Sequence, residues 1–228
     1  MEHKNLVTTN EALGLANDDF YNAYLDDPVL RDRIAMLEKF ADIGDDTQYE
    51  QWDKAAVPGF LAMLALVEGV VLYSSFAFLK HFQSQGKNKI LNIVRGINFS
   101  ARDENIHSES SAWLFRTFMQ EQGMNIAAMS DTVVKMAQLV REHEYAIVDK
   151  IFEKGKIDGI TDVQMRHFID SRINMVLKNL GYEPLFKVDY NPIADWFYDG
   201  LNNLQVNDFF SGQGREYGRK WNEQELVW

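Results

Sequence analysis

The sequence predicts an all-α protein, a bundle of long helices followed by an extended C-terminal tail. Apolar residues recur at three- and four-residue spacing through most of the first 200 positions. The chain contains only four prolines and fourteen glycines, which leaves little room for a sandwich of many short strands. We expect one domain over residues 1–200 and a glycine-spaced tail with isolated aromatics over residues 201–228.

Helix boundaries follow from capping residues and from the apolar periodicity. The expected helices cover residues 8–25, 28–40, 51 or 58 to 83, 88–120, 130–154 and 161–180, and a short turn or helix is expected over residues 192–200. Two of them open with a capping box, in which a Thr side chain and a Glu or Gln three residues later bind each other's backbone N–H groups. These boxes are Thr8-x-x-Glu11 and Thr161-x-x-Gln164.

The other boundaries come from shorter signals. Asp27 before Pro28 gives an N-cap followed by proline at the first helical position. Ser130 and Asp131 are expected to cap the helix that follows them. Glycine is expected to end four helices, because it accepts the left-handed conformation of a helix C-terminus. These glycines are Gly86, Gly123, Gly155 and Gly181.

Composition excludes several classes of function. The net charge of −11 argues against binding to nucleic acid or to an anionic membrane, since both need concentrated Lys and Arg. The chain has no cysteine, so a disulfide, a thiolate ligand and a cysteine nucleophile are excluded. The polar residues after Met1, which looks like a true start, lead into no apolar signal segment. We therefore expect a cytoplasmic protein.

The stretch from Pro58 to Leu79 is apolar apart from Glu68 and a pair of serines. A bilayer-spanning helix needs about 20 apolar residues, so the length would suffice. A carboxylate at the middle of the stretch would be costly in a bilayer, and the flanks carry no aromatic and basic anchors. A helix buried on all sides within a bundle is the favoured interpretation.

A Glu-x-x-His motif at Glu104 and His107 is the strongest chemical signal in the chain. On a helix this spacing places a carboxylate and an imidazole on one face, about one turn apart. With a lone carboxylate such as Glu68 on a neighbouring helix, it forms half of the ligand set of a carboxylate-bridged di-metal site in a helical bundle. The sequence contains no second Glu-x-x-His. The rest of such a site would have to come from elsewhere.

A solvated helix face with an incidental histidine is the alternative interpretation of this motif. Apolar neighbours predict instead that the helix is largely buried, where an unpaired carboxylate is expensive. These neighbours are Ile97, Phe99, Ile106, Trp113 and Leu114. A metal would neutralise both acids, and oxygen-plus-imidazole ligation suits iron or manganese. These residues alone leave the two interpretations about equally supported.

Two further groups of polar residues leave alternatives open. Asp103 could orient an imidazole by accepting its second N–H, or could form a surface ion pair with Arg102. The run Glu142 to Glu144, which includes His143, is expected to be a solvated helix face.

Taken in order, these motifs resemble the small, radical-generating subunit of class I ribonucleotide reductase, a ferritin-like helical protein. The similarity runs through Leu66-Val67-Glu68-Gly69-x-x-Leu72-Tyr73-x-Ser75-Phe76-Ala77-Phe78, Ala101-Arg102-Asp103-Glu104-x-x-His107, Arg172-Ile173-Asn174 to Phe186, Asn191-Pro192-Ile193 and the aromatic tail. The resemblance covers essentially the whole chain. It implies a ferritin-like bundle that is incomplete in this chain.

The resemblance also implies roles for individual residues. Glu68, Glu104 and His107 look like the metal ligands from the C-terminal half of the family's bundle, for a di-iron centre with manganese as an alternative. Asp103 resembles the acid that links a metal-bound histidine to the radical path. Tyr217 is similar in place to the tail tyrosine that passes the radical to the large subunit. The family's reaction is the reduction of ribonucleotides to deoxyribonucleotides.

One large departure from the family shapes the expected partners. The family's first lone acid, first Glu-x-x-His and radical-bearing tyrosine have no counterparts in the sequence. We therefore expect a split small subunit, in which a separate N-terminal polypeptide completes the bundle, assembled subunits dimerise, and residues 201–228 dock on the large subunit. Two alternatives remain: a non-catalytic docking or regulatory fragment, and a homodimer in which two copies complete a symmetric di-metal site.

Overall fold

The structure is a computed structural model that describes residues 17–23, 26–41, 56–199 and 201, with the isolated positions 11 and 14. The described residues are helical, with no β-strand among them, and the predicted all-α class is confirmed. The elements are α2 (Asp18–Asn22), α3 (Pro28–Ala41), α4 (Ala56–Val70), α5 (Tyr73–His81), α6 (Leu91–Glu121), the 3₁₀ helix η3 (Ile126–Met129), α7 (Ser130–Phe152) and α8 (Asp162–Leu180). A further helical stretch covers residues 192–199.

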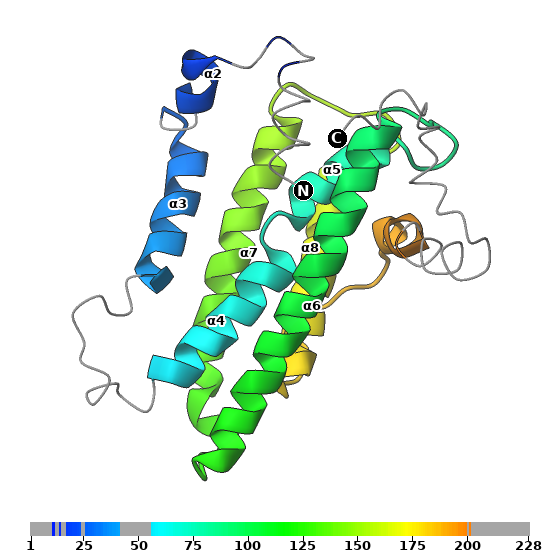
Figure 1. Cartoon of the computed structure of the whole chain (residues 1–228). Helices are drawn as coiled ribbons and strands as arrows, with labels where there is room; N and C mark the ends of the chain where they lie inside the picture. Colours follow the sequence, from blue (N-terminus) through cyan, green and yellow to red (C-terminus); the bar gives the residue numbers. More distant parts are fainter. Residues whose placement is uncertain are drawn as a thin grey trace, which may run out of the picture.

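The core lies between four elements, α4, α6, α7 and α8. Helix α4 packs against the other three, α8 packs against α6 and α7, and α3 lies along the outer side of α7 (Figure 1). Small and apolar side chains of α4 fill the centre, where Ala62, Ala65 and Leu66 are fully buried. Because these residues are mostly small, α4 approaches α6 closely, and this contact carries the candidate site.

The N-terminal helices differ in part from the prediction. Residues 8–25 do not form one helix, because Gly14 lies in a turn with φ of 71° and α2 starts afresh at Asp18. Asn17 caps this new start by accepting a hydrogen bond from the Phe20 N–H at 2.8 Å. Thr8 lies outside the described residues. The predicted start at Asp27 is confirmed, since its carboxylate accepts the N–H groups of the second and third residues of its helix.

The single helix predicted to end at residue 83 is two helices in the structure. Helix α4 ends at Val70 and α5 begins at Tyr73, with Leu72 in the left-handed region at φ 81°. Leucine rarely adopts this conformation, so surrounding contacts must hold it there. Helix α4 ends only two residues after Glu68, so the interruption is part of the environment of the predicted ligand.

Later boundaries agree better with the sequence. The capping box of Thr161 and Gln164 is present, and Gly181 ends α8 with φ of 96°. The predicted cap at Ser130 is wrong, because its side chain caps nothing and Asn125 instead caps the 3₁₀ turn that leads into α7. The expected helix after Asn191 is present over residues 192–199. The tail predicted for residues 201–228 lies outside the described residues apart from Leu201.

The apolar stretch Ala56–His81 is long and apolar enough to cross a membrane by length and composition alone. In the structure, 56% of its most apolar window is buried, and it forms α4 and α5 at the centre of the bundle. The interruption at Leu72 also divides it into two shorter helices. Its apolar character is therefore explained by its place in the core.

Candidate metal centre

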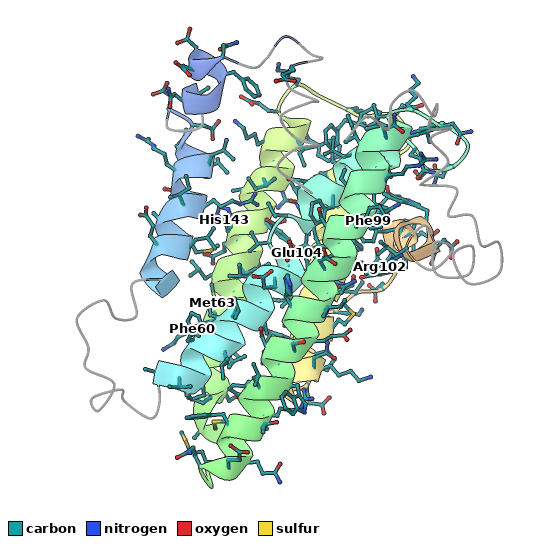
Figure 2. The ribbon with its side chains drawn as sticks, in the orientation of Figure 1. Phe60, Met63, Phe99, Arg102, Glu104 and His143 are labelled. Atoms are coloured by element: carbon teal, nitrogen blue, oxygen red, sulfur yellow. The ribbon has the colours of Figure 1, made fainter. Side chains whose placement is uncertain are left out.

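Two adjacent helices bring the three predicted ligands together. Glu68 comes from α4, and Glu104 and His107 come from one turn of α6. One ligand atom from each lies within 4.8 Å of the others. The His107 Nδ1 atom is 3.5 Å from an oxygen of each carboxylate. Figure 2 shows Glu104 where the ribbons of α4 and α6 cross.

The close approach of α4 and α6 at this level depends on Gly69. A Cβ atom at Gly69 would lie 2.4 Å from both Ser108 Oγ and Val176 Cγ2, so any side chain would push the helices apart. The Ser108 hydroxyl also donates to the Ala65 carbonyl across the contact, at 2.8 Å. Together these contacts place the Glu68 side chain beside Glu104.

The electrostatics of the cluster are set by two acids that lie close together. Burial, and then the neighbouring Glu68 carboxylate, raises the pKa of Glu104 to about 7, while His107 acts in the opposite direction. Desolvation works to lower the pKa of His107, but the two carboxylates outweigh it and the net shift is upward. Within the described residues, no Lys or Arg forms an ion pair with either acid. Two carboxylates and an imidazole converging in this way fit a divalent iron or manganese ion.

The cluster opens to one face of α6 rather than lying deep in the core. The side chains of Glu68 and Glu104 are 27% and 19% exposed, and that of His107 is 59% exposed. The prediction that this helix is largely buried is therefore wrong for part of its length. Three of its apolar side chains, Ile106, Trp113 and Leu114, are exposed on this helix. They form, with His107, a surface that we call the open face.

The remaining predicted site residues are not brought into the cluster. Asp103 is exposed, and no hydrogen bond or ion pair joins it to His107 or Arg102 in the part of the chain that the structure describes. Its role in orienting an imidazole stays a prediction. Tyr217 lies outside the described residues.

Two charged networks beside the site were missed from the sequence. His143 and Glu144 were expected on a solvated face but are buried, and Glu144 forms an ion pair with Arg33 of α3. The Arg33 Nε atom also donates to His143 Nε2 at 2.9 Å. Arg172 of α8 is buried as well, although only its motif had been noted. The regular apolar spacing around His143 and Glu144 on α7 could have predicted that they are buried. The charges of Glu142 and Glu144 favoured a solvated face instead.

Comparison with known proteins identifies the family of this fold and ligand set. The family described as ribonucleotide reductase, small chain, matches residues 8–192. The chain belongs to this family. A probable ribonucleoside-diphosphate reductase small subunit of Invertebrate iridescent virus 3 is 32% identical over 161 residues, or 68% of this chain and 41% of that protein. The ribonucleoside-diphosphate reductase subunit beta of Bacillus subtilis is 29% identical over 163 residues, or 69% of this chain and 47% of that protein.

A solved structure of similar fold agrees with this family assignment. A crystal structure from Bacillus halodurans, described as a class I ribonucleotide reductase, superposes with a TM-score of 0.67 at 21% identity. The match covers 80% of this chain and 63% of that one, and it confirms the ferritin-like helical fold. This small-chain family member spans less than half the length of the two curated relatives above.

Proposed function

We propose that this chain is a component of a ribonucleoside-diphosphate reductase small subunit and supplies half of the ligands of its di-iron centre. The observation that carries the proposal is the convergence of Glu68, Glu104 and His107 within 4.8 Å on two helices of a small-chain bundle. A bound metal pair would supply the oxidising equivalent for radical-based reduction of ribonucleotides. Residues of this chain would hold one side of that pair, with manganese as the alternative to iron.

The open face supports a complementary polypeptide as the source of the missing ligands. His107 is more than half exposed and is flanked by exposed Ile106, Trp113 and Leu114 on the same helix. A partner helix packed here would bury these apolar side chains and could aim its own carboxylate and imidazole at the cluster. We propose that this partner is the N-terminal part of the bundle, encoded as a separate polypeptide.

Family membership supports a proposal about the wider assembly. We propose that assembled small subunits dimerise in the cytoplasm and that residues 201–228 dock on the large ribonucleotide reductase subunit. Asp103 and Tyr217 would then lie on the radical path between the metal centre and that subunit. A synthetic peptide of residues 201–228 should bind the large subunit and compete with the complete chain, and failure to bind would remove the tail from the proposal.

Co-expression with the polypeptide encoded by the neighbouring reading frame tests the split subunit. The two chains should copurify and bind iron, measured as metal per complex. Glu104→Gln should lose metal, because one ligand is removed without changing side-chain size. Glu109→Gln, the same change at an exposed position of α6, should keep it.

Three outcomes would overturn parts of this proposal. A well-folded monomer that ignores the neighbouring polypeptide would exclude the split subunit. About two metals per dimer of this chain alone would favour the symmetric homodimer. Undiminished activity after replacement of all three ligands would favour a docking or regulatory fragment.

A further inference from the structure

A buried guanidinium reaches the helix interruption that follows Glu68. Arg172 of α8 is only 1% exposed, and none of the described carboxylates lies within ion-pair distance of it. Its Nε and Nη2 atoms donate to the Gly69 carbonyl at 2.9 and 2.6 Å. A buried cation without a counter-ion is expensive, so these hydrogen bonds must compensate for the hydration that it lost.

The interruption is bound on its two sides by opposite charges. In a continuous helix the Gly69 carbonyl would accept a hydrogen bond from the N–H group four residues later. Here the chain leaves helical geometry at Leu72, and the Arg172 guanidinium donates to this carbonyl instead. Two N–H groups that the interruption frees point to Glu144 of α7. They belong to Leu72, at 3.4 Å, and Ser74, at 3.1 Å. A carboxylate and a guanidinium from two helices therefore hold the interruption in place.

The same guanidinium also contacts the second ligand helix. Its Nη2 atom donates to Asn105 Oδ1 at 2.8 Å, in addition to the Gly69 carbonyl. Gly69 directly follows the ligand Glu68, and Asn105 directly follows the ligand Glu104. Arg172 thus bridges the two positions next to the carboxylates that converge.

We propose that Arg172 is a positioning residue that sets the spacing of Glu68 and Glu104 by fixing their neighbours. A guanidinium suits this role because its planar fork donates in several directions at once, which an ammonium on a flexible stem does not. The consequence for metal binding rests on the proposed function. The spacing itself does not, because the contacts lie entirely within this chain.

The absence of cysteine allows the spacing to be measured directly. Cysteines introduced at both positions (E68C with E104C) in the full chain, free of metal, can be joined by a short thiol-to-thiol cross-linker and scored by mass spectrometry. Adding Arg172→Met should remove most of the cross-linked product, because the neighbours of both cysteines are released. The matched control is Arg141→Met, which breaks the partly buried α7–α8 ion pair to Asp170, two residues before Arg172, and should leave the yield unchanged.

Circular dichroism melts identify conditions in which both variants are folded, so that a general loss of stability cannot mimic the effect. Equal cross-linking with and without Arg172→Met in folded protein would overturn the proposal. If that variant does not fold, Arg172→Lys decides: a reduced yield supports the role, and an unchanged yield overturns it.

Metal binding gives the second readout. In the assembled complex, Arg172→Met should weaken Mn²⁺ affinity by about tenfold or more, the loss typical of removing an outer support of a ligand, and Arg141→Met should not. If the unaltered complex binds no Mn²⁺ or iron, the proposed metal function fails. The cross-linking result still decides the role of Arg172.

Discussion

Glu144 and the pair Glu68 and Glu104 are acids within one bundle, but the chain neutralises only the first. Glu144 is fully buried, forms an ion pair with Arg33, and accepts the Ser74 N–H at 3.1 Å and the Ser74 hydroxyl at 2.5 Å. Each of its oxygens therefore has a defined donor from another element. This is a completed structural network, because nothing outside the chain is needed to satisfy it.

The ligand pair lacks such compensation. Among the described residues, Glu68 and Glu104 have the His107 imidazole, at 3.5 Å, as their ion-pair partner, and burial and then the neighbouring Glu68 raise the pKa of Glu104 to about 7. The cluster also opens toward exposed apolar side chains. The contrast indicates that Glu144 maintains the fold, whereas no Lys or Arg among the described residues pairs with Glu68 or Glu104, as the proposed metal centre would require.

The largest predicted difference comes from truncating one acid of each kind. Glu144→Ala should cost about 3–5 kcal/mol in free energy of unfolding, because Arg33 and the interruption lose their buried partner. Glu104→Ala should cost little in metal-free protein, since it relieves repulsion from Glu68. Urea denaturation measures both, and equal losses would remove the distinction between the two sites.

The pH dependence of the free energy of unfolding should reveal the burial of His143 beside Arg33. Burial, and then the nearby Arg33 charge, lowers the pKa of His143 to about 4, against 6.5 for an ordinary histidine. Between these values the unfolded chain binds more protons at this histidine, so the contribution of His143 to the free energy of unfolding should fall by about 3 kcal/mol as pH drops from 6.5 to 4. His143→Gln should flatten this part of the profile. A difference between the two proteins that does not vary with pH would contradict the assignment.

Gly69→Ala should have an intermediate effect, because it tests the contact that places the ligands together. The added Cβ meets Ser108 and Val176 at 2.4 Å, so we expect a loss of about 1–3 kcal/mol from overpacking. Gly59→Ala is the control, since its Cβ would have only ordinary contacts, the nearest at 3.8 Å. Thermal melts of the two variants measure the difference. Similar melting temperatures would show that α4 and α6 adjust freely.

The smallest effect on stability is expected on the open face. Trp113→Ser should change the free energy of unfolding of this chain by about 0.5 kcal/mol or less, because the side chain is exposed. The same change should weaken binding of the complementary polypeptide by about 2 kcal/mol, as for a buried aromatic anchor. Val163→Ser, at a similarly exposed position on α8, should alter neither. Unchanged copurification of the Trp113 variant would place the partner elsewhere.

Local signals predicted much of this fold correctly. The start of α3 at Asp27 and the capping box of Thr161 depend on side chains that bind backbone within three residues, and such contacts are readable without tertiary knowledge. The interruption at Leu72 was missed, because its freed backbone groups are bound by Glu144 and Arg172, far away in sequence. Periodicity also overestimated burial around Trp113, since an exposed apolar face has the same residue spacing as a face in the core.

The sequence by itself determined the helical class and the family, and it singled out the three candidate ligand residues, because residue type and short spacing carry that information. The tertiary structure decided that the carboxylates meet, since this depends on how closely α4 and α6 pack at Gly69. It also decided which acids the chain satisfies. Hydrogen-bond partners from distant helices satisfy Glu144, whereas His107 is the ion-pair partner of Glu68 and Glu104 within the part of the chain that the structure describes.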